Sequence, residues 1–144
     1  MTRHFLTLKD LSPSELIALI HRAIALKQDP MGPKTANLLH LRTMVLIFEK
    51  SSTRTRISFE VACAHLGGSS VFLSPTDSQM SRGESISDTA RIVSSMADLI
   101  VMRTSEHSRV GTMAEHSAVP VINALSQDFH PCQLLADLQT FYEH

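Results

Sequence analysis

The chain has no tryptophan, one tyrosine and only two cysteines among its 144 residues. Cys63 and Cys132 lie far apart in the sequence, which argues against the disulfide framework of a small secreted domain. The eight histidines are scattered without metal-ligand spacing, so we expect neither a metal site nor another cofactor. Positive and negative charges are balanced, since the chain has 13 Lys and Arg residues and 14 Asp and Glu residues. This balance argues against a nucleic-acid partner, and against a cluster of basic residues that would bind a membrane surface.

The sequence also has no apolar run near the ~20 residues that a transmembrane helix needs. Its first residues mix charged and apolar side chains, so the continuous apolar core of a secretory signal is missing. We therefore expect a cytoplasmic protein with no membrane partner. At 43% hydrophobic residues, the chain can form one domain, residues 1–144, with a substantial core.

Segments typical of strands and of helices alternate along the chain. Four short runs are apolar and rich in β-branched residues, as buried strands are; they cover residues 44–48, 70–73, 99–102 and 119–123. Segments with helical spacing separate these runs. A capping box at Ser12–Glu15, with Pro13 at the first helical position, predicts one more helix ahead of the first strand. The pattern predicts an α/β fold, a four-stranded parallel sheet with helices on both faces.

The last predicted helix starts at Pro131 and carries apolar residues that we expect to face inward. They are Leu134, Leu135, Leu138, Phe141 and Tyr142. The apolar pattern continues almost to His144, with no capping glycine or polar tail after it. Either this helix frays into solvent or the chain is the excised half of a longer protein, and we favour excision.

Hydroxyl and guanidinium groups follow the first predicted strand directly, in the segment Ser51–Arg56. They stand where the first N–H groups of the next helix point outward without intrahelical partners. Free N–H groups, the helix dipole and positive charge together make an anion site, for which phosphate is well suited. The alternative is that Ser52 merely caps the helix and the arginines are solvated. Because arginines oppose the dipole at a helix N-terminus, a bound anion explains the pattern better.

The other polar segments fall at the same edge of the predicted sheet. Ligands of open α/β sheets collect beyond the carboxyl ends of the strands. The segments that follow those ends carry Ser52–Arg56, Ser74–Gly83, Arg103 and His130. Each has a simpler interpretation: a solvated loop, an arginine emerging into solvent, or a His-Pro pair that only begins a helix.

The segment SSTRTRISFE, residues 51–60, resembles the carbamoyl-phosphate loop of the aspartate and ornithine carbamoyltransferases. Glu49-Lys50 before it is similar to the ornithine branch. Two further stretches in the same order strengthen the resemblance, Met102-Arg103-Thr104 and the run HPCQLLADLQT from His130. The resemblance covers nearly the whole chain but only the carbamoyl-phosphate half, so it implies the N-terminal half of the two-domain transcarbamoylase architecture, without the amino-acid-binding domain.

The resemblance implies roles for particular residues. Carbamoyl phosphate would be held by Ser52, Thr53, Arg54, Thr55, Arg103, His130 and Gln133. Arg103, His130 and Thr55 would act in catalysis by stabilising the developing oxyanion, and Gln133 would orient the carbamoyl amide. Cys132 is better interpreted as a small helix residue than as a nucleophile, because no histidine stands at a recognisable activating distance in the sequence.

In this family a loop matching residues 74–83 reaches into the neighbouring subunit. Gln79 is therefore a candidate to act in trans, which implies a homotrimer or a multiple of trimers. The family's extra basic residue usually falls near Gly83, whereas here the arginine is Arg82, and its participation stays open.

The function implied is that of an ornithine carbamoyltransferase in arginine biosynthesis, which makes citrulline and phosphate from ornithine and carbamoyl phosphate. The isolated chain should bind the donor but be inactive, and ornithine would bind through the missing domain. Alternatives are a carbamoyltransferase acting on putrescine, a modified ornithine or aspartate, or a stand-alone phosphate-binding module. The sequence leaves open the acceptor amine, the biosynthetic or catabolic direction and the oligomeric state of this chain alone.

Overall fold

The computed structural model describes residues 2–30, 32, 37–74, 76 and 78–144. Within them, four strands form one parallel sheet in the order β2-β1-β3-β4. The strands are β1 Thr43–Phe48, β2 Ser69–Leu73, β3 Leu99–Arg103 and β4 Val121–Leu125. The predicted fold is therefore confirmed, although β4 begins and ends later than its apolar run indicated.

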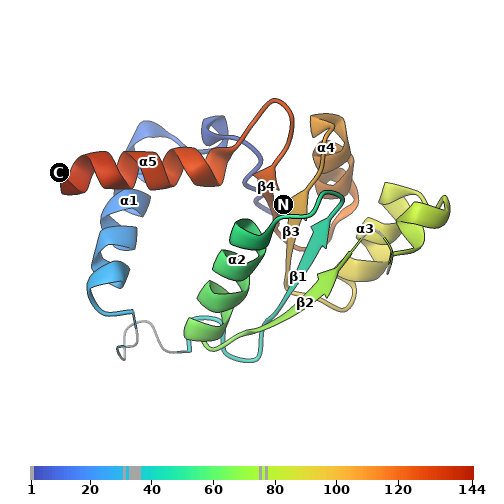
Figure 1. Cartoon of the computed structure of the whole chain (residues 1–144), viewed down its shortest axis with the longest axis horizontal. Coiled ribbons are helices and arrows are strands. Elements are labelled where there is room, and N and C mark those ends of the chain that lie inside the picture. Colours follow the sequence, from blue (N-terminus) through green and yellow to red (C-terminus); the bar gives the residue numbers. More distant parts are fainter. Residues whose placement is uncertain (1, 31, 33–36, 75, 77) are drawn as a thin grey trace.

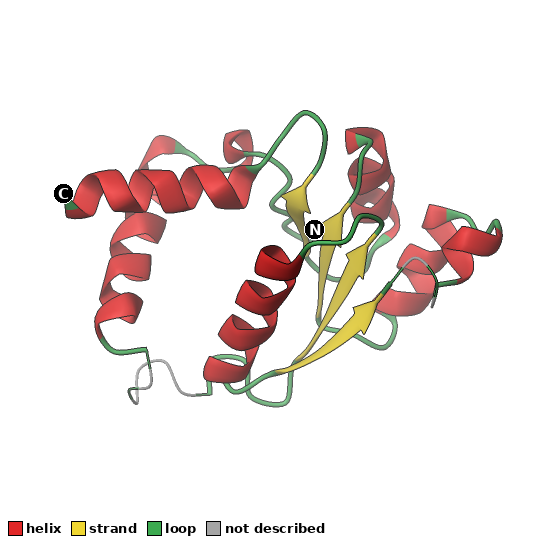
Figure 2. Cartoon of the chain, viewed as in Figure 1, coloured by secondary structure: helices red, strands yellow, loops and turns green. Residues whose placement is uncertain are grey.

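Helices connect the strands and cover both faces of the sheet. They are α1 Pro13–Gln28, α2 Thr53–His65, α3 Ile86–Ser94, α4 His107–His116 and α5 Pro131–Glu143, with short 3-10 helices η1 Leu8–Asp10 and η2 Gln79–Arg82. Figures 1 and 2 show α2 and α5 on one side of the sheet and α3 with α4 on the other. The predicted capping box begins α1 as expected, and α1 packs against α5.

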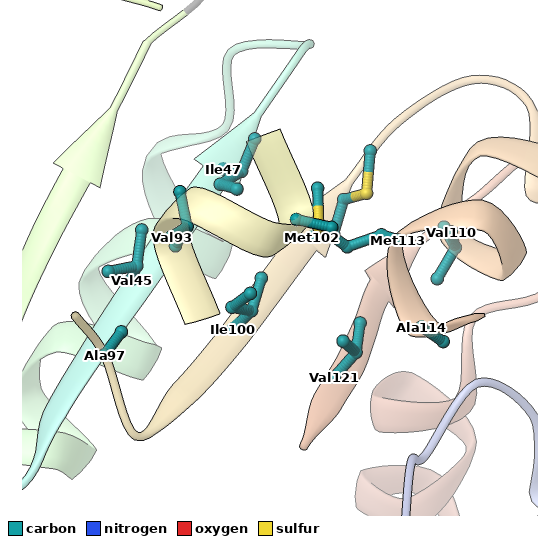
Figure 3. Packing of buried hydrophobic residues seen from close by; sticks show 11 residues of the cluster. Val45, Ile47, Val93, Ala97, Ile100, Met102, Val110, Met113, Ala114 and Val121 are labelled. Carbon is teal, nitrogen blue, oxygen red and sulfur yellow. The ribbon is translucent and has the colours of Figure 1, made fainter. Parts of the chain in front are cut away.

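The strands bury side chains on both faces, which explains why their sequences are apolar without alternation. In β1, Val45 and Ile47 join the core under α3 and α4, whereas Leu46 and Phe48 join the core on the α2 side. Figure 3 shows the first core, in which strand residues meet side chains such as Met113 of α4. The two clusters fix the sheet between its helices and so fix where the strand ends lie.

The prediction that α5 turns its apolar residues inward is wrong for three of them. Leu134, Phe141 and Tyr142 are 47%, 80% and 48% exposed. The reason is that α5 runs away from the sheet toward α1 (Figure 1), where Lys27 and Glu143 form an ion pair at 2.7 Å. α1 buries only Ile20, so the later turns of α5 have little to pack against in the described part of the chain.

The two ends of the central strand pair are held differently. At the amino ends of β1 and β3, the Arg42 guanidinium pairs with Asp98 at 2.6 Å, and the Thr43 N–H donates to the same carboxylate at 2.9 Å. At the carboxyl ends, the register of β3 with β4 shifts between Met102 and Arg103. All four strands point the same way, so the segments after them meet at this second edge.

Candidate functional site

The N-terminus of α2 lies just beyond the carboxyl end of β1. Ser52 is the N-cap residue, and the Arg56 N–H donates to the Ser52 carbonyl at 3.2 Å as the helix begins. The Ser52 side chain makes no capping hydrogen bond. The N–H groups of Thr53, Arg54 and Thr55 have no intrahelical partners in α-helical geometry, so this helix start is open to an anion.

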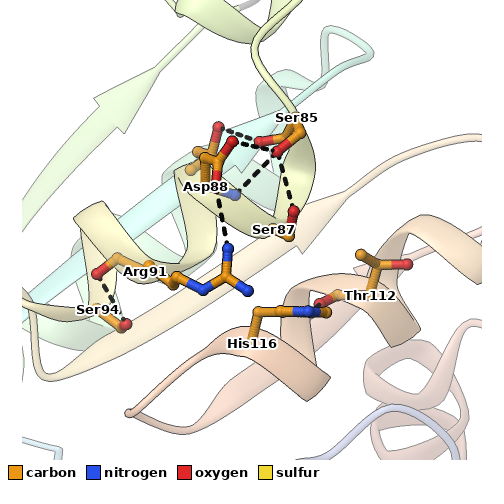
Figure 4. Close-up of polar contacts among 8 residues, drawn as sticks. Ser85, Ser87, Asp88, Arg91, Ser94, Thr112 and His116 are labelled. Carbon is orange, nitrogen blue, oxygen red and sulfur yellow. Dashed lines mark hydrogen bonds and ion pairs between the residues drawn. The ribbon is translucent and has the colours of Figure 1, made fainter.

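Other serine and threonine N-cap residues of the described chain do cap their helices. The Ser12 hydroxyl accepts from the Glu15 N–H at 3.3 Å, and Thr7 accepts from the Lys9 N–H at 3.1 Å. At α3, Ser85 accepts from the Asp88 N–H at 3.1 Å, within the polar network of Figure 4. Ser52 therefore stands at the N-cap position of α2 without making the side-chain bond that a plain cap would make. The free amides and the dipole at α2 favour a negatively charged ligand.

Arg103 brings a positive charge to this helix start. It is the last residue of β3, beside Phe48 of β1 in the sheet register, and its Nη1 donates to the Thr55 hydroxyl at 3.0 Å. Its Nε is buried and has no hydrogen-bond partner among the described residues. The predicted proximity of Arg103 to the loop is confirmed, and part of its donor capacity remains available.

His130 approaches the same place from the end of β4. It is the N-cap residue of α5, with Pro131 at the first helical position as predicted. Its Nδ1 is also buried without a partner in the described chain. Burial, and then the positive charge of Arg103, lower the pKa of His130 below its ordinary 6.5, although Asp137 opposes this shift. At neutral pH the imidazole is therefore uncharged, with one nitrogen able to donate and the other to accept.

These groups line one open cavity of about 420 Å³. Its walls come from α2, the ends of β3 and β4, and the first turns of α5. Six of the predicted binding residues line it: Ser52, Arg54, Thr55, Arg103, His130 and Gln133. The seventh, Thr53, is exposed and borders two neighbouring hollows instead.

The two arginines of the first turn of α2 point to different surroundings. Arg54 is exposed and lines the cavity. Arg56 donates to Glu60 at 3.1 Å, and its guanidinium lies 3.7 Å from the centre of the Phe72 ring. The charge of Arg56 is therefore already paired and stacked, and of the two arginines only Arg54, the one predicted to hold carbamoyl phosphate, lines the cavity.

Gln133 stands one turn into α5, and its amide is partly engaged. Its Nε2 donates to the Asp137 carboxylate at 2.9 Å. The amide oxygen of Gln133 takes no part in this hydrogen bond and can act as an acceptor. Cys132 beside it is mostly buried, and burial raises the pKa of its thiol to about 11. A thiol with so high a pKa stays protonated at neutral pH, which agrees with a packing role.

Comparison with known proteins places this geometry in a family. A family model described as "Aspartate/ornithine carbamoyltransferase, carbamoyl-P binding domain" matches residues 3–143. The chain belongs to this family. It is 59% identical over 142 residues to the ornithine carbamoyltransferase of Hydrogenovibrio crunogenus, and 58% identical to that of Psychrobacter sp. strain PRwf-1. These alignments cover 99% of the chain and 47% and 46% of those relatives, so the chain spans about half the length of the curated relatives it matches.

Solved carbamoyltransferase structures have the same fold. The anabolic ornithine carbamoyltransferase of Campylobacter jejuni superposes with a TM-score of 0.91 at 47% identity, covering 99% of this chain and 45% of that one. The ornithine carbamoyltransferase of Pyrococcus furiosus gives a TM-score of 0.92 at 45% identity, covering 98% and 45%. The recognition of the family from its three sequence motifs is confirmed.

Gln79 and Arg82 lie between β2 and α3, in the segment that resembles the family's inter-subunit loop. Gln79 begins η2 and is exposed, and Gln79 and Arg82 are not among the residues that line the 420 Å³ cavity. Met80, next to Gln79, packs against the core under α3 and α4. Gln79 therefore lies on the surface of the chain, and its action in the site of a neighbouring subunit stays a prediction.

Sequence reasoning missed the buried residue that fixes the approach to His130. The Asn123 amide donates to the Leu6 carbonyl at 3.0 Å, to the Ser126 hydroxyl at 3.2 Å and to the Phe129 carbonyl at 3.4 Å. His107 also contacts the Ser126 hydroxyl, at 2.9 Å through its Nδ1. A polar Asn inside the apolar strand Val-Ile-Asn-Ala-Leu was the available signal, because a buried side-chain amide needs hydrogen-bond partners.

The described residues contain no group of three His, Cys, Asp or Glu side chains arranged to hold a metal ion. Over the same part of the chain, no helix combines the length and apolar character needed to cross a bilayer.

Proposed function

We propose that this chain is the carbamoyl-phosphate-binding half of an ornithine carbamoyltransferase, which transfers a carbamoyl group to the δ-amino group of ornithine. The observation that carries the proposal is the convergence on one cavity of the open α2 N-terminus, Arg103 and His130. The identity to proteins named ornithine carbamoyltransferase supports ornithine as the acceptor. A second domain, outside this chain, would bind it.

The phosphate of the donor would lie against the first turn of α2. The N–H groups of Thr53, Arg54 and Thr55, the Ser52 hydroxyl and the Arg54 guanidinium can all donate to phosphate oxygens. Helix N–H groups and a guanidinium together suit a dianionic phosphate, through the dipole and through charge-assisted bonds. Ser52 is available for this because its hydroxyl makes no capping hydrogen bond.

The carbamoyl group would then extend toward Arg103 and His130. The neutral amine attacks the carbonyl carbon, the C–O bond to phosphate breaks, and phosphate leaves with the bonding electrons. The proton that the attacking nitrogen loses would pass to the departing phosphate. Negative charge develops on the carbonyl oxygen, where Arg103, His130 and the Thr55 hydroxyl would donate hydrogen bonds. His130 can donate while neutral, so its lowered pKa is compatible with this role. The Gln133 amide oxygen would accept from the carbamoyl NH₂ group.

Arginine biosynthesis in the cytoplasm is the setting we propose. Gln79 would reach the site of a neighbouring subunit in a homotrimer, since it lies outside the cavity of its own chain. A cyclic trimer uses a heterologous interface that closes, and such an interface can place one residue per subunit into the next site.

The test is carbamoyl transfer by the complete gene product. Ornithine, putrescine and aspartate are compared at saturating carbamoyl phosphate, with the carbamoylated product measured. The proposal expects citrulline formation to exceed the other two reactions by at least tenfold in kcat/KM. A preference for another amine would correct the acceptor. Phosphate binding without transfer to any amine would favour the stand-alone module.

A further inference from the structure

Glu49 occupies a position that the proposed chemistry does not use. It follows β1 directly, and its backbone N–H donates to the Arg103 carbonyl at 2.9 Å. Its side chain is 22% exposed and is not among the groups that line the 420 Å³ cavity. The carboxylate points toward the start of α4, so Glu49 lies behind the site.

Its carboxylate is held by two residues that follow β3. Arg109, in the first turn of α4, donates from Nε to both carboxylate oxygens at 3.0 Å and from Nη2 to one of them. The Thr104 hydroxyl donates to the other oxygen. Thr104 is fully buried, and its backbone N–H donates to the Leu125 carbonyl at 3.0 Å. Several charge-assisted bonds on one half-buried carboxylate define its position closely.

Together with the backbone, these contacts connect the residues on both sides of Arg103. Glu49 is joined through residues 50–54 to Thr55, whose hydroxyl accepts a hydrogen bond from Arg103. Arg103 is in turn joined through Thr104 and the start of α4 to Arg109, which donates hydrogen bonds to the Glu49 carboxylate. The sheet pairs Arg103 with Phe48 of β1 and Leu125 of β4, but the register of β3 with β4 shifts between Met102 and Arg103. Beside this shift, the contact of Glu49 with Arg109 adds a link between the end of β1 and α4.

We propose that Glu49 is a positioning residue, which acts through Thr104 and Arg109 to hold Arg103 and the α2 N-terminus at their working separation. The inference rests on the proposed function for what the cavity binds. A small misplacement of such groups can cost up to ~100-fold in rate without any direct contact to the substrate. Glu49 lies outside the cavity proposed for the donor, so its removal should act through the geometry of the two binding elements.

The experiment compares Arg109→Met with Arg42→Met in the complete gene product. Arg109→Met removes the guanidinium that holds Glu49 and keeps the aliphatic stem. Arg42→Met breaks the ion pair with Asp98 at the opposite ends of the same two strands. We expect Arg109→Met to raise the KM for carbamoyl phosphate about tenfold, with the KM for ornithine within twofold. Arg42→Met should leave both unchanged, and Arg109→Lys should recover most of the loss.

Binding of inorganic phosphate, measured by calorimetry, gives a second readout that does not need transfer activity. If the parent protein catalyses no transfer, the proposed function fails, but Arg109→Met should still weaken phosphate binding more than Arg42→Met. Should Arg109→Met not fold, Thr104→Val removes one donor at nearly constant volume and should raise the same KM severalfold. Equal losses of thermal stability with no change in donor KM or phosphate affinity would overturn the inference, since the cluster would then serve stability alone.

Discussion

Replacing Arg54 tests whether the anion site depends on one particular arginine of α2. Arg54→Met keeps the aliphatic stem and removes the guanidinium that lines the cavity. Arg56→Met, two residues later on the same helix, removes a guanidinium that is already paired with Glu60 and stacked on Phe72. The two variants change net charge equally, so only placement distinguishes them.

The expected magnitudes differ enough to be measured. Losing a charge-assisted hydrogen bond costs about 1.5–3 kcal/mol, which is roughly a ten- to hundredfold loss in affinity. A unit charge about 10 Å from an anion contributes ~0.4 kcal/mol in water before salt screening, or roughly twofold. Arg54→Met should therefore weaken phosphate binding at least tenfold, and Arg56→Met no more than about twofold.

Calorimetry with inorganic phosphate at constant ionic strength measures both affinities. Arg22→Met, which removes an exposed charge on α1, serves as a control for net charge alone. Thermal melts show whether each variant is folded; the broken Arg56–Glu60 pair should cost only ~0.3–0.5 kcal/mol. Equal weakening by Arg54→Met and Arg56→Met would refute the assignment of the anion to the cavity between α2 and α5.

Three further predictions follow from the site. If Gln79 acts in trans, mixing inactive Gln79→Ala and Arg54→Met subunits of the complete gene product should restore activity, and verified mixed trimers without activity would contradict that role. NMR titration should place the pKa of His130 below 6.5, and Arg103→Met should raise it, because removing a positive charge favours protonation while burial still disfavours it. Because the pKa of His130 is lower in the folded chain than in the unfolded chain, the unfolded chain binds more protons as pH falls below about 6.5. The free energy of unfolding of the parent chain should therefore decrease over that range. The 144-residue chain should bind phosphate yet form no citrulline, because positioning of the amine supplies ~7–11 kcal/mol of barrier reduction; turnover near that of the complete gene product would contradict this.

Local sequence determined much of this protein. Four apolar runs without alternation require burial on both faces, and helical segments between them require parallel crossovers, so the sheet and its helices could be predicted. The same reasoning placed Ser52, Arg103 and His130 at one sheet edge, because parallel strands share the direction of their ends. The signals were local: β-branched runs, capping residues, and proline at the start of α5.

Tertiary structure decided which of these residues act together. Arg54 and Arg56 are indistinguishable by spacing, but Glu60 and Phe72 lie where they engage only Arg56. The contact of Glu49 with Arg109 joins residues far apart in the chain, and no local pattern could indicate it.

The last helix shows the same division between local and tertiary information. Its apolar residues predict a buried face, yet Phe141 remains 80% exposed. A sequence pattern specifies that a face is apolar, whereas burial depends on which surfaces the fold brings to it. Which charged groups pair, how far apart they lie and which side chains are exposed depend on contacts between residues distant in the sequence. Such contacts form only when the chain folds.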